Sequence, residues 1–226
     1  KNYRSKRKNR PISLQVILID IMGTITWNNL ITKEKFYSIK EKYGRVASWA
    51  IWAHEDEEPK SNMGDLTVLD PEINKNLLSE LNPNVVLVAL NFSENVDHKP
   101  FENFHAGGKF QDYKTRYALR DSPAWGGYMT DIIKDYPEKE TDRLVEYLKT
   151  DKAIEQSNIE SFRQELRDIE AKKPKLVAFG NDVYDILKRN LPEFEVVKIP
   201  HYAHFISKEK YREQVRQLIR EHETDG

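Results

Sequence analysis

The sequence predicts an α/β fold: a three-layer αβα sandwich with a central, mainly parallel four-stranded sheet. The first observation is the run at residues 85–93, Val-Val-Leu-Val-Ala-Leu-Asn-Phe-Ser, which is apolar until small polar side chains appear at its end. A strand without alternation is buried on both faces, as parallel strands are. Residues 128–133, 176–180 and 196–201 form three similar segments, each with a polar group or a glycine near its end. Helical patterns lie between them, and strands alternating with helices favour right-handed βαβ crossovers.

Apolar residues at three- and four-residue steps predict the helices. Phe36, Ile39 and Tyr43 place one helix over residues 33–43, and Asp70 with Pro71 opens another that continues to Leu81. Further helices are expected over residues 112–119, 144–148, 159–169 and 182–188, and from residue 208 onward. Residues 46–53 fit a strand or a packed aromatic segment, and the acidic residues 55–58 fit a surface loop. The irregular stretch from 94 to 110 is long enough to be functional or disordered.

The length of 226 residues and the hydrophobic content of 38% are sufficient for one principal domain. We expect this domain over residues 33–226 and a basic amino-terminal arm or extension over residues 1–32. Residues 1–10 are strongly basic and are followed by an apolar segment, which is the order found in signal peptides. Asp20 interrupts that apolar segment, so a basic arm or an ordered extension is favoured over a secretion signal.

The charge balance and the amino-acid content exclude several classes. The 36 basic residues nearly cancel the 37 acidic ones, so net charge neither supports nor excludes a polyanionic partner. The absence of cysteine excludes disulfides, thiolate metal sites and a cysteine nucleophile. No apolar stretch approaches the roughly 20 residues that span a bilayer. We therefore expect a soluble monomer without a membrane partner, and the lack of cysteine fits the reducing cytoplasm.

Four segments in chain order carry a family resemblance. Ala-Leu-Asn-Phe-Ser at residues 89–93 is similar to Gly-x-Asn-Pro-Gly/Ser, and Tyr-Met-Thr-Asp-Ile-Ile-Lys at 128–134 is similar to Tyr-Ile-Thr-Asn-Val-Val-Lys. Residues 162–187 resemble a helix, Arg-Pro, strand, Leu-Gly, helix signature, and residues 200–204 stand where a His-Pro-Ser-Pro motif is expected. From about residue 82 to residue 219 the chain resembles the uracil-DNA glycosylase superfamily, in particular its mismatch-specific and single-strand-selective branches.

The resemblance implies hydrolysis of the N-glycosidic bond of a base flipped out of DNA, with no cofactor and no metal. His201 would donate a hydrogen bond to the leaving base, and Asn91 would position the attacking water with help from Ser93. An asparagine does not deprotonate water, so a slow enzyme is expected. The implied partner is DNA, or a free nucleobase or nucleotide.

The base contacts implied by the resemblance fall on Phe101, which follows Pro100, and on Asp131, Phe92 and His204. Relatives carry an asparagine at the position of Asp131, and an amide offers both a donor and an acceptor. An ionised Asp131 only accepts, so it would favour a base presenting two donors, or it would have to stay protonated through burial. Ala89 and Phe92 also depart from the motif, as does the Tyr-Ala pair after His201.

Structural interpretations stay open for each of these residues. Asn91 could cap a turn, Asp131 could pair with Lys134, and Phe101 could belong to the core. The His-x-x-His spacing of His201 and His204 could hold a metal, but no cysteine and only scattered carboxylates accompany it.

Two other functions also remain open. A non-catalytic module that binds a nucleotide or nucleic acid would tolerate the departures from the motif. Residues 16–26 resemble the first motif of haloacid-dehalogenase-like phosphatases, with Asp20 as the nucleophile. Met22 occupies the general-acid position of that motif, which counts against the phosphatase.

Overall fold

The computed structural model describes residues 16–19, 25–28, 31–91, 99–105, 111–134, 136 and 140–221. The chain divides into two compact units, Lys1–Leu30 and Ile31–Gly226, whereas the sequence placed the division after residue 32. In the first unit, β1 (Val16–Ile19) pairs with β2 (Ile25–Asn28) in an antiparallel ribbon. Asp20, the nucleophile of the phosphatase interpretation, lies outside the described residues.

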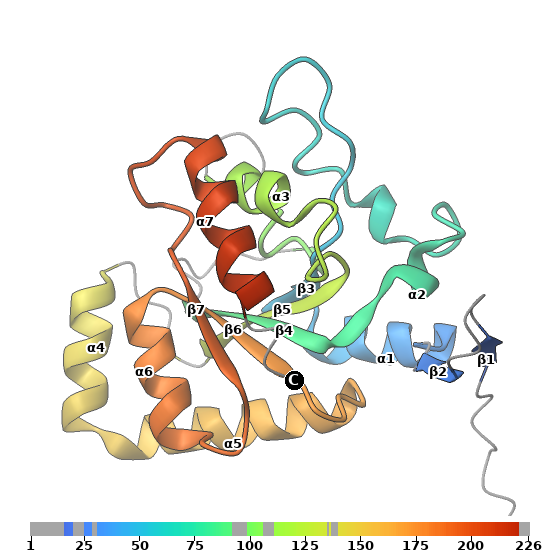
Figure 1. The fold of residues 1–226 in the computed structure, drawn as a ribbon. Helices are drawn as coiled ribbons and strands as arrows, with labels where there is room; N and C mark the ends of the chain where they lie inside the picture. Colours follow the sequence, from blue (N-terminus) through green and yellow to red (C-terminus); the bar gives the residue numbers. More distant parts are fainter. Residues whose placement is uncertain are drawn as a thin grey trace, which may run out of the picture. The chain divides into compact units, whose positions relative to one another are not determined.

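A five-stranded sheet in the order β3-β5-β4-β6-β7 forms the centre of the second unit (Figure 1). Its strands are β3 (Ala47–Trp49), β4 (Asn82–Asn91), β5 (Gly127–Ile133), β6 (Lys175–Phe179) and β7 (Val196–Ile199). The last four are parallel to one another, which confirms the predicted α/β fold with a mainly parallel sheet. The strand not counted in the prediction is β3, a three-residue edge strand that pairs antiparallel with β5.

Helices cover both faces of this sheet, as a three-layer sandwich requires. They are α1 (Lys33–Tyr43), α2 (Leu77–Glu80), α3 (Tyr113–Leu119), α4 (Thr141–Thr150), α5 (Lys152–Asp168), α6 (Asn181–Asn190) and α7 (Lys208–Glu221). A 3-10 turn, η1, spans Leu66–Leu69. The apolar side chains of α1, α4, α5 and α6 share one core, and those of α3 and α7 share the other. Figure 1 shows α3 and α7 lying side by side above the sheet, with α5 running below it.

Alternate side chains of β4 enter the two cores, because successive residues of a strand point to opposite faces. Val86 and Val88 pack on the side of α5, whereas Leu87 and Ala89 pack on the side of α3 and α7. All four are buried, as the continuous apolar run of the sequence predicts. None of the helices in the described part of the chain is long and apolar enough to cross a membrane.

The helix expected from Asp70 to Leu81 is wrong over most of its length, since only Leu77–Glu80 is α-helical. The Asp70 carboxylate accepts the N–H of Glu72, and the side-chain oxygen of Asn74 accepts the N–H of Asn76. Such local side-chain bonds offer the backbone an alternative to the helix. They hold residues 70–76 in turns.

Gly126, just before β5, has a backbone conformation and a close neighbour that an alanine at this position could not accommodate without strain. Its φ is +78°, and an added Cβ would lie 1.8 Å from the carbonyl oxygen of Glu80. We expect Gly126→Ala to lower the free energy of unfolding by about 2 to 3 kcal/mol, measured by urea denaturation. Gly64→Ala is the matched control, because its Cβ would meet no atom closer than 3.6 Å. Equal stability of the two variants would contradict this account of the turn.

Candidate functional site

The carboxyl ends of the parallel strands lie at one edge of the sheet. Along the chain, β4 connects to β5 on one side, and the following strands β6 and β7 lie on the other. The strand order therefore reverses between β4 and β6. In open α/β sheets, ligands bind outside the carboxyl ends at such a switch point. Asn91 ends β4, and Gly180 follows β6.

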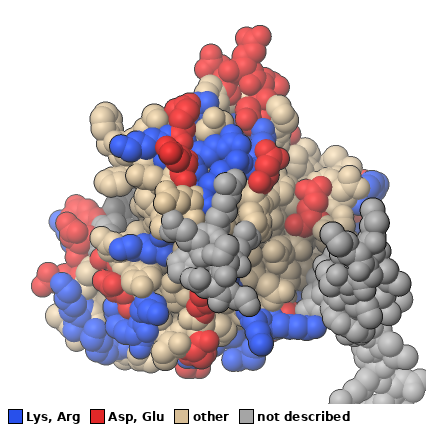
Figure 2. Space-filling view, in the orientation of Figure 1, with Lys and Arg blue, Asp and Glu red and all other residues tan. Residues whose placement is uncertain are grey.

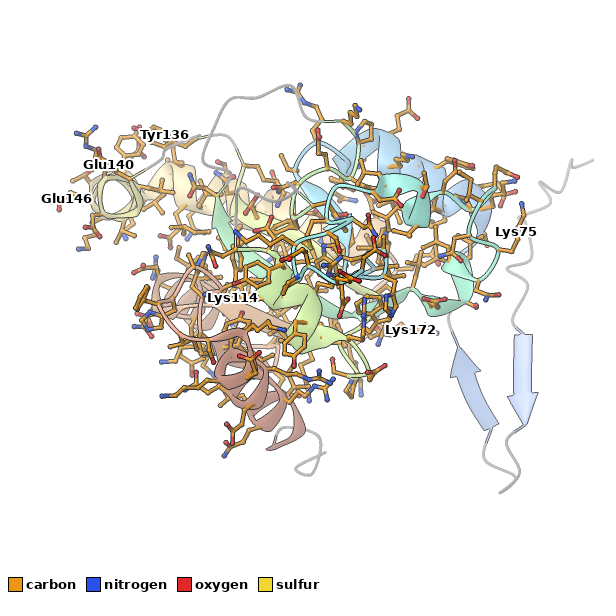
Figure 3. The ribbon with its side chains drawn as sticks, turned by 90° about the horizontal axis from the view of Figure 1, so that it is seen from above. Lys75, Lys114, Tyr136, Glu140, Glu146 and Lys172 are labelled. Carbon is orange, nitrogen blue, oxygen red and sulfur yellow. The ribbon has the colours of Figure 1, made fainter. Side chains whose placement is uncertain are left out.

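Asn91 and Asp131 lie on neighbouring strands near this edge. Asp131 is paired in register with Ala89, and Asn91 with Ile133, so Asn91 stands slightly nearer the carboxyl edge. The Asn91 side chain donates to the carbonyl of Tyr136 at 3.4 Å. Tyr136 stacks on Tyr147 of α4, with 4.7 Å between ring centroids. Figure 3 shows Tyr136 beside the beginning of α4, so Asn91 links the end of β4 to that region.

Asp131 is a buried carboxyl group, with 1% of its surface exposed. Asn103, from the segment 99–105, donates its amide N–H to Asp131 Oδ2 at 2.8 Å. Burial raises the pKa of Asp131 to about 7, although the hydrogen bond from Asn103 and the charge of Lys134 act in the opposite direction. The carboxyl group therefore exists in both protonation states near neutral pH.

The opposite face of β5 carries a buried polar network centred on Glu165 of α5. Glu165 accepts hydrogen bonds from the Tyr128 hydroxyl at 2.7 Å and from the Thr130 hydroxyl at 2.9 Å. Its other oxygen pairs with the Lys134 ammonium at 2.8 Å. Lys134 also donates to the backbone carbonyl of Asp131. The pairing considered between Lys134 and Asp131 thus involves the backbone of Asp131, and the network fixes the strand end that carries it.

The turn after β7 brings His201 and Tyr202 to the same edge. The two rings stack at 4.3 Å, and Tyr202 meets Phe179 of β6 edge-on at 5.4 Å. Burial raises the pKa of Tyr202 well above its ordinary value, and the charges of Asp112 and Asp131 add to this effect. Tyr202 therefore contacts β6 and lies within electrostatic range of Asp131 on β5.

His201 is held as a neutral imidazole with a defined tautomer. Partial burial lowers its pKa, and the charge of His204 lowers it further. Its Nδ1 accepts the backbone N–H of Ala203 at 3.2 Å. A nitrogen that accepts carries no proton in the neutral ring, so the proton lies on Nε2. His201 therefore presents an N–H donor at the edge of the sheet.

A groove of about 670 Å³ lies beside this turn, between the beginning of α6, the end of β7 and α7. Lys198, Lys210, His201 and His204 line it, and none of its described lining residues is acidic. Neither Asn91 nor Asp131 lines this groove. The structure thus places Asn91 and Asp131 on the neighbouring strands β4 and β5, whereas His201 follows β7, on the other side of β6.

Not every expected site residue reaches this edge. Phe101 is completely buried and packs edge-on against Phe36, with the Lys40 ammonium over its ring, so it is a core residue with no exposed face for a base. Phe92 and Ser93 lie outside the described residues. His204 is exposed, its N–H donates to the His201 carbonyl, and its own carbonyl accepts from Lys114 of α3 at 3.0 Å.

The sequence interpretation missed Asn103, Tyr202 and Phe205. Phe205 is fully exposed, although large apolar side chains are usually covered. Its place four residues after His201 in the same turn is visible in the sequence, but its exposure is not. Asn103 becomes a candidate only through its contact with Asp131, 28 residues further along the chain.

A second, smaller cavity of about 190 Å³ lies beneath the acidic loop, lined by Glu55, Tyr113, Arg116 and Lys208 among others. Figure 2 shows acidic residues gathered on this loop at the top of the view, with basic residues directly below. The buried Arg116 guanidinium donates to the carbonyls of Ala53, Pro59 and Ser61. These bonds anchor the loop, so this region is structural.

Comparisons with protein-family models, with curated proteins and with solved structures find no match for this chain. Groups of three or more side chains that could hold a metal ion are also absent from the part of the chain that the structure describes. The geometry of the carboxyl edge of the sheet is therefore the basis of the proposed function.

Proposed function

We propose that this chain is a DNA-base N-glycosylase of the uracil type, or a close relative, which hydrolyses the N-glycosidic bond of a flipped base. The observation that carries the proposal is the turn after β7. It combines a neutral imidazole donor at His201 with a fully exposed aromatic ring at Phe205, beside a groove lined by lysines and histidines. The motif order in the sequence supports the same function.

His201 suits the stabilisation of a leaving base. As the bond between C1′ and the base nitrogen breaks, the bonding electrons go to the base, whose oxygen gains negative charge. A preorganised N–H donor stabilises such charge without reorganisation during the reaction. The lowered pKa of His201 keeps the ring neutral, and the Ala203 N–H fixes the donor on Nε2.

Asn91 suits the positioning of the water whose oxygen forms the new bond to C1′. Its bond to the Tyr136 carbonyl fixes the plane of the amide at the end of β4. An amide orients water but does not remove its proton, so the rate depends on the leaving base. A slow reaction with good leaving bases follows from this residue.

The groove and Phe205 favour nucleic acid over a free base. Lys198 and Lys210 supply positive charge in a groove whose described lining contains no carboxylate, which suits phosphates. An exposed aromatic ring can stack on a base or occupy the space that a flipped base leaves. Phe205 stands on the turn that also carries His201, so one turn would contact both the strand and the extruded base.

The test is incubation with single-stranded and duplex oligonucleotides carrying uracil, hypoxanthine or xanthine, followed by alkaline cleavage of abasic sites. We expect abasic product, and a loss of about 10²-fold in rate for Asn91→Ala and for His201→Ala. Phe205→Ala should reduce cleavage of duplex more than of single strands, because only the duplex must be unstacked. Ile73→Ala is the matched control, since this exposed apolar side chain lies in the 70–76 turns.

Absence of abasic product with every base, together with measurable nucleotide binding, would contradict the enzyme. That result would favour a non-catalytic module that binds nucleotides or nucleic acid through the same edge.

A further inference from the structure

The middle of the turn after β7 is exposed to solvent. Ala203, His204 and Phe205 are all exposed, and Phe205 completely so. The residues on either side, Tyr202 and Ile206, pack against the core that α3 and α7 share. Packing of its own side chains therefore fixes the two ends of the turn and leaves residues 203–205 without a fixed position.

A buried lysine of α3 supplies the missing contact. Lys114 is 5% exposed, and its ammonium group donates to the His204 carbonyl at 3.0 Å. Within the described residues, this is the hydrogen bond that joins residues 203–205 to a distant part of the chain. The same carbonyl accepts the backbone N–H of Ile206 at 2.8 Å, which uses its second lone pair. Figure 3 shows Lys114 beside this turn.

A lysine is a costly choice for this position. Burial of an ammonium group costs free energy unless an opposite charge and hydrogen bonds compensate for it. In the part of the chain that the structure describes, Lys114 has no carboxylate partner, and the His204 carbonyl is its hydrogen-bond acceptor. An apolar side chain of similar volume would serve the stability of α3 at least as well. The bond to the turn is therefore what the ammonium adds.

The beginning of the turn is held by other contacts. The hydroxyl of Tyr211 in α7 donates to the Pro200 carbonyl at 3.0 Å, directly before His201. Tyr202, directly after His201, packs edge-on against β6. These contacts lie on both sides of His201, so its position does not depend on Lys114.

We propose that Lys114 is a positioning residue that holds Phe205 in place to enter a DNA duplex, whereas His201 is positioned independently by the beginning of the turn. This inference rests on the proposed function, since it takes the Phe205 ring to occupy the space that a flipped base leaves. The His204 carbonyl belongs to the planar peptide group that leads into Phe205, so the bond from Lys114 fixes the plane from which the ring projects.

The first measurement needs no nucleic acid. Lys114→Met keeps the apolar stem and removes the ammonium, and Lys114→Gln is a second variant whose side chain is one bond shorter. Hydrogen exchange of the full chain, followed by NMR, should be about tenfold faster at the Ile206 N–H in both variants, because the turn opens more often without the bond from α3. Exchange at the Gly180 N–H, which donates to the Ile199 carbonyl, should not change. An unaltered exchange rate at Ile206 would overturn the inference.

The second measurement compares base release from duplex and from single strands. Lys114→Met should lower the rate on duplex about tenfold and leave the rate on single strands within about twofold, because only the duplex must be unstacked. Lys114→Arg keeps the charge and the donors, so it should restore most of the duplex rate. Tyr211→Phe removes the bond at the beginning of the turn and should lower both rates alike. Lys75→Met is the matched control, since the Lys75 side chain is 71% exposed.

A double variant tests whether Lys114 acts through Phe205. If the lysine does nothing but position this ring, Lys114→Met should have no further effect on the duplex rate once Phe205 is replaced by alanine. Such non-additivity is expected of two residues that act as one unit, whereas independent structural effects add.

The outcomes separate the two proposals. Equal losses on duplex and single strands in Lys114→Met, or a loss that persists in the Phe205→Ala background, would overturn this inference alone and leave the proposed function intact. Absence of abasic product from the unaltered chain with every base would overturn the proposed function and this inference with it.

Discussion

Replacing Glu165 by alanine is expected to lower the free energy of unfolding by about 3 to 5 kcal/mol, because removing one partner of a buried ion pair leaves the other charge uncompensated. Glu165 is completely buried and is the acceptor for Tyr128 and Thr130. Without it, the Lys134 ammonium, whose side chain is only 11% exposed, loses its carboxylate. Urea denaturation at neutral pH measures the loss as a lower midpoint.

Two variants on the same helix serve as controls. Glu165→Gln keeps an acceptor for the two hydroxyls but removes the charge, so a smaller loss of about 1 to 3 kcal/mol is expected. Glu160→Ala removes an exposed carboxylate that lies 4.0 Å from Arg163, and its effect should stay within about 0.5 kcal/mol. If Glu165→Ala were as stable as Glu160→Ala, the network would not hold the end of β5.

Replacing His105 by phenylalanine is expected to raise the free energy of unfolding by about 3 kcal/mol at pH 4. His105 is 1% exposed, and neither ring nitrogen forms a well-aligned hydrogen bond; the backbone of Trp49 raises the pKa of the ring, but by less than burial lowers it. Burial lowers its pKa to about 3, with the charge of Arg116 acting in the same direction. The unfolded chain takes up a proton below pH 6.5 and the folded chain does not, so stability is lost as the pH falls from 6.5 toward 3. Phenylalanine can keep the contact with Trp52 and cannot take up a proton.

The protonation of Asp131 changes stability in the opposite direction to that of His105, over an overlapping pH range. The folded pKa of Asp131, about 7, lies above the ordinary value of 3.8, so the folded chain holds a proton that the unfolded chain has released. This contribution is present at low pH and is lost as the pH rises from about 4 to 7. The contributions of these two groups to the pH dependence of stability offset each other between about pH 4 and pH 6.5.

Single and double variants separate the two effects. Relative to the unaltered chain, His105→Phe should become progressively more stable as the pH falls through this window, because the opposing contribution of His105 is removed. Relative to the unaltered chain, Asp131→Asn should become progressively less stable as the pH falls, and the double variant should keep the pH dependence of the unaltered chain. Denaturation midpoints at half-unit pH intervals measure these slopes. A slope left unaltered by either single substitution would contradict the assigned protonation states.

The regular elements near the site could be predicted because their patterns are local. The spacing of Phe36, Ile39 and Tyr43 with the stop at Gly44 locates α1, and the apolar run at residues 85–91 locates most of β4. Strand ends in turn locate Asn91 and Asp131, since parallel strands present their carboxyl ends at one edge. Such information is carried by neighbouring residues and needs no knowledge of packing.

Packing decided the roles that depend on distant segments. Phe101 follows Pro100 in an irregular stretch, and only the position of α1 shows that its ring is enclosed by Phe36. Phe205 is also a phenylalanine, but its ring is fully exposed. Nothing in the local sequence distinguishes Phe205 from Phe101. Exposure of an aromatic ring is set by which helix or strand covers it.

The sequence by itself determined the α/β class, the parallel strands and the polar residues at their ends, because hydrophobic periodicity and strand direction are local properties. Only the tertiary structure decided the chemical state of those residues. It placed the amide N–H of Asn103 on Oδ2 of the buried Asp131, and it placed the N–H of Ala203 on Nδ1 of His201, which leaves the proton of the neutral imidazole on Nε2. The physical reason is that a pKa and a tautomer depend on burial and on the partners that folding supplies.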